Sequence, residues 1–351
     1  MEKNKSKLNN LLELFYQTYQ KQNKNSVFLE SLKKNKKKYK WEDVYININK
    51  LSDEISNYIK KNDRCLIISE NRPEWMILDL SIMLSGGITV PAYTSYTERD
   101  YEYIIDDCTP TVIVVSNNSQ YEKIKNIIPK KNFIKKVISF DEINSQIETP
   151  FLNVNNIFKR VNYRNQDFLN LEIRRNDIAC IIYTSGTQGN PKGVILTHGG
   201  ILSNCDGAHS LIKKFTSKKP KFLTWLPLSH SYEHTVQFVQ IALGAKVFYA
   251  ESIDKLIKNM SDCSPEIMTA VPRFYQNLYQ KINKTFYETK GFRKILINKT
   301  LKLGKKRLNK NSLSLTENFI DFVCEIMVRK KIKKQFGGNL KAFISGGGAL
   351  D

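Results

Sequence analysis

This 351-residue sequence lacks closely spaced cysteines. The six cysteines contain no Cys-x-x-Cys pair, and no secretory leader is expected ahead of them. A disulfide framework or a zinc ribbon is therefore not expected, and reduced thiols in a cytoplasm are expected. The cysteines are Cys65, Cys108, Cys180, Cys205, Cys263 and Cys324.

A long uninterrupted apolar segment is also missing. The longest candidate runs from Trp75 to Tyr93, but Asp79, a Gly-Gly pair and Pro91 break it. About 20 consecutive apolar residues are needed to cross a bilayer as a helix. The segment therefore predicts a buried helix that leads into a strand, and no membrane span is expected.

Acidic residues are scarce, since 34 Asp and Glu stand against 55 Lys and Arg, a formal net charge of +21. Such a balance by itself indicates a nucleic acid or an anionic membrane as partner. The sequence has no RNP-type aromatic motif, zinc-knuckle spacing or arginine-rich reading helix, so no nucleic-acid partner is expected. Most of the basic residues are lysines that accompany many Asn and Ile, as in the product of an AT-rich coding sequence.

Hydrophobic residues make up 41% of a chain that is long enough for about two domains. From residue 64 onward short apolar strands alternate with helical patterns, which favours an α/β fold with an open parallel sheet. Upstream, the spacing predicts helices over 8–20 and 42–60, with a solvated hairpin tip at the lysine run 33–40. The next predicted elements are strands 65–69, 88–91, 112–116 and 137–140 and helices 73–85, 98–107 and 120–128.

A polar, Asn-rich stretch over 141–175 predicts a connection between two α/β subdomains. We place the boundary near residue 172, so that residues 1–172 form the first subdomain and residues 173–351 the second. In the second subdomain the pattern predicts strands 178–183, 193–197, 221–226, 245–249 and 266–270 and helices 199–212, 232–243, 252–261 and 272–284.

Between residues 181 and 198, two apolar runs enclose a segment rich in glycine and hydroxyl side chains. Glycines permit positive φ and allow several backbone N–H groups to converge on one anion. Thr184, Ser185 and Thr187 add hydroxyl donors, and Lys192 adds a positive charge. The spacing differs from that of a Walker A loop, because no Gly-Lys-Ser/Thr follows at the required distance. The segment therefore predicts a polyphosphate-binding loop of another class.

The segment Tyr-Thr-Ser-Gly-Thr-Gln-Gly-Asn-Pro-Lys-Gly at 183–193 resembles the signature of the AMP-binding, or acyl-adenylate-forming, superfamily. Within it, the segment looks like that of the long-chain fatty acyl-CoA ligases. Residues 70–93, 268–276 and 343–350 also resemble this family. The resemblance implies the large N-terminal domain of these enzymes, built from two stacked αβαβα-type subdomains, without the distal barrel and the C-terminal lid domain.

The run Leu-Pro-Leu-Ser-His-Ser-Tyr-Glu-His at 226–234 supports two incompatible interpretations. As His-x-x-Glu-His it matches the inverted zincin pattern, in which two histidines on a helix hold zinc. The resemblance to the ligases instead implies that His230 lies between the acyl tunnel and the nucleotide site, with Tyr232 and Glu233 at the tunnel mouth. A structural histidine at a helix start is a third alternative for His230.

The sequence departs from the family at four places, and one of them is Gly348, which stands where alanine is more usual and is expected to loosen the turn slightly. His234 stands where the ligases have arginine, and since an unperturbed imidazole is mostly neutral near pH 7, a weakened ion pair is expected there. Gln188 replaces the commonest threonine of the loop. The sequence stops at Asp351, before the Tyr-Gly-x-Thr-Glu and Thr-Gly-Asp segments and the domain that carries the adenylation lysine. We therefore expect an N-terminal fragment of a ligase that is incomplete for turnover.

The resemblance implies a long-chain fatty acid–CoA ligase, which converts fatty acid, ATP and CoA through acyl-AMP into acyl-CoA, AMP and pyrophosphate. Such chemistry uses Mg²⁺ and converging donors to screen the attack of one anion on another. Lys192 and His230 are the expected catalytic residues, and Thr184 is the expected magnesium ligand. His230, Tyr232 and Glu233 are expected to contact the acyl substrate. The expected nucleotide-binding residues are Thr184, Ser185, Gly186, Thr187, Gln188, Gly189, Lys192, Ser345, Gly346, Gly347 and Gly348.

Two alternatives for the function stay open. One is another adenylate-forming enzyme, either an acyl-AMP ligase or a peptide-synthetase adenylation module. The other is a non-catalytic half that binds a nucleotide or a lipid.

Residues 281–335 hold 16 Lys and Arg against 4 Asp and Glu, with leucines at helical spacing. They indicate either a solvated lysine-rich helix pair or a basic amphipathic surface that contacts an anionic membrane. The second interpretation would place a cytoplasmic protein peripherally on the inner membrane surface.

Overall fold

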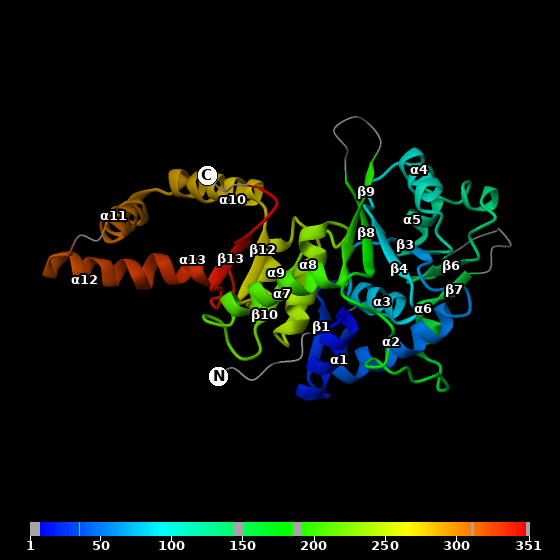
Figure 1. Cartoon of the computed structure of the whole chain (residues 1–351). Helices are drawn as coiled ribbons and strands as arrows, with labels where there is room; N and C mark the ends of the chain where they lie inside the picture. Colours follow the sequence, from blue (N-terminus) through cyan, green and yellow to red (C-terminus); the bar gives the residue numbers. More distant parts are fainter. Residues whose placement is uncertain (1–7, 35, 144–150, 185–190, 310–311, 349–351) are drawn as a thin grey trace. The chain divides into compact units, whose positions relative to one another are not determined.

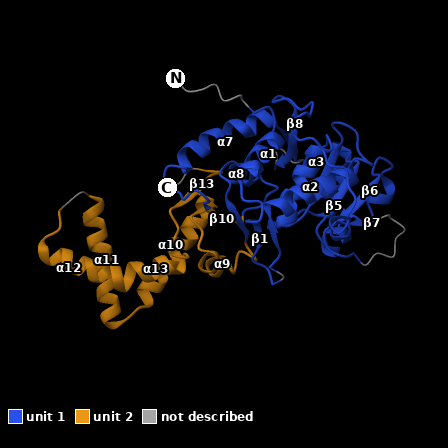
Figure 2. Ribbon diagram, turned by 90° about the horizontal axis from the view of Figure 1, so that it is seen from below, with its two compact units in different colours: residues 1–220, 226–249 blue, residues 221–225, 250–351 orange. Residues whose placement is uncertain are grey.

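The computed structural model describes residues 8–34, 36–143, 151–184, 191–309 and 312–348. The chain divides into two compact units (Figure 2). Unit 1 comprises residues 1–220 and 226–249, and unit 2 comprises residues 221–225 and 250–351. Both units combine helices with mainly parallel strands, which confirms the expected α/β class.

A seven-stranded sheet forms the larger part of unit 1 (Figure 1). Its strands are β3 (Arg64–Ile68), β4 (Ile88–Ala92), β5 (Val112–Val115), β6 (Lys136–Ser139), β7 (Phe151–Asn153), β8 (Ile178–Thr184) and β9 (Lys192–Thr197). The order across the sheet is β7-β6-β5-β3-β4-β8-β9, and only the edge pair β8–β9 is antiparallel. The predicted open parallel sheet is therefore confirmed.

The helices that connect these strands follow the apolar spacing of the sequence. They are α2 (Trp41–Ile55), α3 (Pro73–Leu84), α4 (Glu98–Cys108), α5 (Asn118–Glu122), the short 3-10 helix η1 (Ile128–Lys130) and α6 (Val154–Phe158). Helix α3 has a proline in its first turn, where a backbone N–H has no helical partner, and every one of its residues is buried. The predicted buried helix after Trp75 is thus confirmed.

The predicted continuous helix over 120–128 is wrong. Helix α5 ends at Glu122, and the chain continues in turns, with the N–H groups of Ile124 and Ile127 each bonded three residues back. These tighter turns bring Ile124, Ile127 and Ile128 to the same buried cluster. Packing of the isoleucines decides the local conformation, because burying apolar surface outweighs the weak helical propensity of a short segment.

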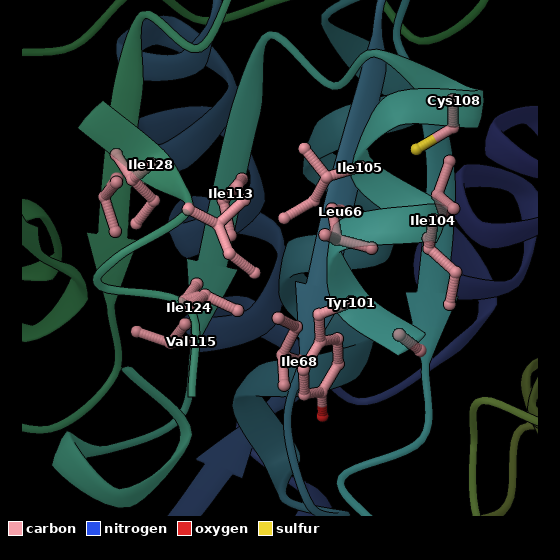
Figure 3. Close-up of a cluster of buried hydrophobic side chains, with 14 of the residues drawn as sticks. Leu66, Ile68, Tyr101, Ile104, Ile105, Cys108, Ile113, Val115, Ile124 and Ile128 are labelled. Atoms are coloured by element: carbon pink, nitrogen blue, oxygen red, sulfur yellow. The ribbon is translucent and has the colours of Figure 1, made fainter. Parts of the chain in front are cut away.

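That cluster is the core on one side of the sheet (Figure 3). Strands β3 and β5 contribute one pair of apolar side chains each, and helix α4 covers them. The side chains that Figure 3 labels are Leu66, Ile68, Tyr101, Ile104, Ile105, Cys108, Ile113, Val115, Ile124 and Ile128. The cluster fixes α4 on the sheet and so supports the neighbouring strands β4 and β8.

Unit 1 also contains a smaller group of strands and three further helices. These are β1 (Val27–Ser31), β2 (Lys38–Lys40), β11 (Lys246–Tyr249), α1 (Leu11–Lys21), α7 (His198–Ile212) and α8 (Ser231–Ala242). Strand β1 is parallel to β11 and antiparallel to β2, which confirms the hairpin predicted at the lysine run. Helix α8 packs against α1 and α7.

Unit 2 contains three parallel strands and a run of helices. The strands are β10 (Lys221–Thr224), β12 (Ile267–Ala270) and β13 (Ala342–Ser345), and the helices are α9 (Leu256–Cys263), α10 (Pro272–Glu288), α11 (Gly291–Leu308), α12 (Leu315–Cys324), the π-helical turn η2 (Glu325–Arg329) and α13 (Lys330–Gln335). No helix among the described residues is both long and apolar enough to span a bilayer.

The two units do not divide the chain at residue 172. Strands β8 and β9 follow that position and share a sheet with β3 to β7, which precede it. The division into subdomains 1–172 and 173–351 stays a prediction.

Candidate functional site

The predicted phosphate-binding loop joins the antiparallel strands β8 and β9. Thr184 ends β8, Lys192 begins β9, and the two residues face each other in the register of the pair. Directly opposed residues in an antiparallel pair project from the same face, with Cβ atoms about 5 Å apart. Both residues are exposed. A hydroxyl and an ammonium group therefore flank the loop at its base.

Five of the predicted nucleotide-binding residues lie within the loop and outside the described part of the chain. They are Ser185, Gly186, Thr187, Gln188 and Gly189. Their roles stay predictions.

The base of the hairpin is fixed on the rest of unit 1. Tyr183 donates a hydrogen bond from its hydroxyl to the carboxylate of Asp107, at the end of α4. Burial is the main cause that raises the pKa of Tyr183, and this hydrogen bond to Asp107 is the second. Opposite Tyr183, a Cβ on Gly193 would lie 2.9 Å from Cγ2 of Ile181, so only glycine fits there without a shift. The strands that carry Thr184 and Lys192 thus have a rigid base.

His230 is the residue that caps the N-terminus of α8. Its backbone is extended, and its Nδ1 accepts a hydrogen bond from the Tyr232 backbone N–H at 3.1 Å. An imidazole that accepts at Nδ1 carries its proton at Nε2 when neutral. The side chain is exposed, so Nε2–H can donate to a ligand in front of the helix. The predicted position at the start of a helix is confirmed.

The zinc interpretation of the same run has no support in the geometry. The ring of His234 is completely buried and lies 3.2 Å from Asp79, whereas His230 is exposed. The part of the chain that the structure describes holds no group of three or more His, Cys, Asp or Glu placed to bind a metal ion.

Asn71 attaches the segment that precedes His230 to the end of β3. Its side-chain amide donates to the carbonyl oxygen of Leu226 at 2.6 Å and accepts from the N–H of Leu228 at 3.0 Å. A side chain that satisfies both a donor and an acceptor of an irregular segment fixes its path. The sequence motif at 70–76 indicated only the resemblance to the family. It did not predict that Asn71 positions this segment.

A second attachment lies inside the unit, between α3 and α8. His234 Nε2 lies 3.2 Å from Asp79 Oδ2, and the Gln237 amide donates to the same oxygen at 2.9 Å. The edge of the Trp75 ring packs against His234, with centroids 5.3 Å apart. Asp79 thus holds the first two turns of α8 against α3.

The expectation of a mostly neutral imidazole at His234 is wrong. Burial by itself lowers the pKa of His234, but the neighbouring Cys180 and Asp79 side chains outweigh burial and raise it well above 6.5. An opposite charge within hydrogen-bonding distance favours the charged form. The raised pKa favours the charged form of His234 beside Asp79 and so favours the ion pair.

The other two predicted substrate-contacting residues lie in the first turn of α8. Tyr232 is half-buried and Glu233 is buried.

A buried tyrosine, Tyr249, lies near two carboxylates. Burial is the main cause that raises the pKa of its hydroxyl, and the charges of Glu74 and Glu233 raise it further. Glu74 is paired with Lys37 at 2.8 Å and Arg72 at 3.0 Å. Burial opposes these cations, which prevail and lower the pKa of Glu74 to about 2.

The remaining predicted nucleotide contacts lie in unit 2. Ser345 ends β13 opposite Ala270, and the Gly346 N–H donates to the carbonyl of Ala270 at 3.2 Å. Gly347 has φ +80°, a conformation that favours glycine. At Gly348 a Cβ would meet only Pro272, at 3.5 Å, so the alanine common in the family also fits there. The glycine turn after β13 is present as the sequence predicts, and its role in adenine binding stays a prediction.

The mainly parallel sheet and the β8–β9 hairpin, which has an exposed hydroxyl and an exposed lysine at its base, define a class of α/β proteins. The sequence pattern of AMP-binding enzymes matches residues 15–351, and the chain belongs to that family.

Relatives with known activities agree with this family. The chain is 27% identical over 333 residues to long chain acyl-CoA synthetase 3 of Arabidopsis thaliana, covering 89% of the chain and 49% of the relative. It is 27% identical over 303 residues to fatty acyl-CoA synthetase A of Dictyostelium discoideum, covering 84% and 43%. The chain spans about half the length of the curated relatives it matches.

Solved structures share the fold at lower identity. ATP-bound MatB from Rhodopseudomonas palustris has a TM-score of 0.67 at 19% identity, with 97% of this chain and 55% of MatB covered. A red-emitting luciferase from Phrixothrix hirtus has a TM-score of 0.66 at 17% identity, with 76% and 51% covered. A fold shared by a luciferase and other enzymes does not specify the acid that is activated.

Proposed function

We propose that the protein activates a long-chain fatty acid with ATP to acyl-AMP and then transfers the acyl group to CoA. The observation that carries the proposal is the opposed pair Thr184 and Lys192 at the base of a family-typical loop. The chain-length class rests on relatives that are long-chain acyl-CoA synthetases. These two relatives are 27% and 26% identical to the chain.

In the first step a carboxylate oxygen of the fatty acid attacks the α-phosphorus of ATP, and pyrophosphate leaves. Two anions must approach each other, so positive charge and hydrogen-bond donors around the phosphates lower the barrier. Lys192 supplies a charge at the end of β9, and Thr184 supplies a hydroxyl across from it. We therefore assign Lys192 to the pyrophosphate side of the nucleotide.

Magnesium binds hard oxygen ligands and usually combines protein oxygens with phosphate oxygens and water. The exposed hydroxyl of Thr184 fits as one such ligand. Phosphate oxygens of ATP would be further ligands. When bound, the ion neutralises charge on the phosphates.

In the second step the CoA thiolate attacks the acyl carbon, and AMP leaves with the oxygen that came from the fatty acid. His230 presents Nε2–H at the N-terminus of α8, where the helix dipole also favours a negative group. This end of α8 suits the carboxylate end of the acyl substrate. Tyr232 and Glu233, in the same turn, are assigned to the mouth of the acyl site.

The test is the exchange of labelled pyrophosphate into ATP by a full-length purified protein that contains these 351 residues, measured with palmitate, with acetate and with no acid. The proposal predicts exchange with palmitate and little with acetate, followed by AMP release on addition of CoA. Exchange without CoA-dependent release would instead favour an acyl-AMP ligase. ATP binding without exchange under any acid would favour a non-catalytic nucleotide-binding half.

A further inference from the structure

Helix α12 in unit 2 has a stripe of apolar side chains that face solvent. Leu315, Phe319, Phe322 and Ile326 follow one another at intervals of four, three and four residues, and their exposed fractions are 91%, 71%, 63% and 45%. This spacing places Leu315, Phe319 and Phe322 on one face of α12, and Ile326 lies in the π-helical turn η2 that continues it. Isolated exposed apolar residues are normal, but a contiguous row usually marks a contact surface. We refer to these four residues as the α12 stripe.

The orientation of α12 is fixed by its opposite side. Asp321 is buried and pairs with Arg307 of α11 at 2.6 Å and with Arg329 at 2.5 Å. Lys306 of α11 pairs with Glu317 at 2.6 Å. These contacts hold the polar side of α12 against α11, so rotation of α12 cannot bury the stripe without breaking them.

Helix α11 adds further apolar surface. Its inner side chains pack in unit 2, whereas four large apolar residues are exposed on it. The exposed residues are Phe292, Ile295, Leu301 and Leu308.

Basic residues surround this apolar surface. Residues 281–335 carry 16 Lys and Arg against 4 Asp and Glu, a net charge of +12. Figure 1 shows α12, η2 and α13 as one continuous rod, so the lysines of α13 follow directly on the stripe. Lys330, Lys331, Lys333 and Lys334 are all exposed.

We propose that the α12 stripe, with the lysines of α13 that follow it, binds to the surface of an anionic lipid bilayer. Aromatic and aliphatic side chains enter the interface while lysines bind acidic headgroups, each contributing to affinity. A second copy of the same surface would carry the same +12 charge and be repelled, so charge complementarity favours the anionic bilayer. No described helix can span the membrane, so binding is peripheral.

The test is co-sedimentation of the whole chain with phosphatidylcholine vesicles and with vesicles that also contain phosphatidylserine. The chain is expected to bind the second kind and to dissociate in high salt. The double variant Phe319→Ser, Phe322→Ser should weaken binding by at least about tenfold, because two large side chains no longer enter the interface. Lys331→Gln should weaken it by about fivefold.

The matched control is Leu211→Ser, an exposed leucine on α7 in unit 1, which should leave vesicle binding unchanged. All the substituted side chains are exposed, so circular dichroism should show the same thermal transition in every variant. Equal binding to both vesicles, or binding that the double variant leaves intact, would overturn the proposal. A third outcome would also overturn it: the unchanged chain forms concentration-dependent dimers and binds no vesicles, and the double variant is monomeric. That result would assign the stripe to a second copy of the chain. This test does not depend on ligase activity.

Discussion

The surroundings of His234, and not its residue type alone, raise its pKa in the interior of unit 1. The sequence shows that arginine is replaced by histidine, but it does not show that Asp79 lies 3.2 Å from the ring. Asp79 is 155 positions away in the sequence and shares no local pattern with His234. The residues that flank the predicted phosphate loop belong to a local motif, whereas Asn71 and Asp79 act through long-range contacts that no local motif predicts.

Replacing Asp79 with asparagine tests the buried pair. Asp79→Asn should lower the free energy of unfolding by about 3 kcal/mol at pH 7, because a buried His234 charge loses its counter-charge. The raised pKa of His234 means that the pair stabilises fully below 6.5 and progressively less as the pH rises towards the raised value. Urea unfolding at several pH values measures both effects. Glu122→Gln, in an exposed pair with Lys125, is the control and should cost less than about 0.5 kcal/mol.

His198 has the opposite shift and should make the protein sensitive to acid. Burial lowers the pKa of His198 to about 4, although Asp177 and Asp79 oppose the shift. The folded protein therefore disfavours protonation of His198. This contribution to the free energy of unfolding is fully present above pH 6.5 and is lost as the pH drops towards 4. At about pH 4.5 the loss should be about 2 to 3 kcal/mol. In urea unfolding, His198→Gln should show a pH dependence smaller by this amount, and an unchanged dependence would contradict the assignment.

Lys192 should bind the nucleotide through its charge. Lys192→Gln removes one charge-assisted contact to phosphate and should weaken ATP binding by about ten- to a hundredfold. Isothermal titration with ATP measures this change. Lys213→Gln, an exposed lysine near the end of α7, is the matched control. Unchanged ATP affinity in Lys192→Gln would remove Lys192 from the site.

At the scale of elements, the N-terminus of α8 is positioned from two sides by the chain segment that follows β3. Asn71 holds the approach to the helix, and Asp79 holds its first two turns. Periodicity predicted most helices and strands, because apolar spacing in the sequence is the same spacing that packs the core. It failed at 120–128, where the packing of three isoleucines replaces the helix by turns.

Loss of the Asn71 side chain should affect activity more than stability. Asn71→Ala removes both hydrogen bonds to the segment before His230, so the α8 end should lose its fixed position. We expect fatty-acid-dependent pyrophosphate exchange to fall by about tenfold, with a shift in melting temperature of only a few degrees. Asn57→Ala, on an exposed part of the chain after α2, should change neither quantity. A large loss of stability with normal exchange per folded molecule would contradict a positioning role.

At the scale of the whole molecule, the family is shown by a match that covers residues 15–351. The fold is shared with solved structures that are less than 20% identical in sequence. Sequence patterns predicted the α/β class and the parallel sheet correctly. They did not predict which strands share a sheet, because pairing between β4 and β8 depends on contacts across about 90 residues of chain. The chain covers about half of its relatives, so the acid and the thiol acceptor are proposals.

The most direct test of the central claim follows an oxygen atom. A purified protein containing these 351 residues is given ATP, CoA and palmitate labelled with ¹⁸O in its carboxylate, and the AMP is analysed by mass spectrometry. An acyl-adenylate mechanism predicts that one labelled oxygen appears in the phosphate of AMP. ATP consumption that leaves AMP unlabelled, or that transfers the label to orthophosphate, would contradict the account.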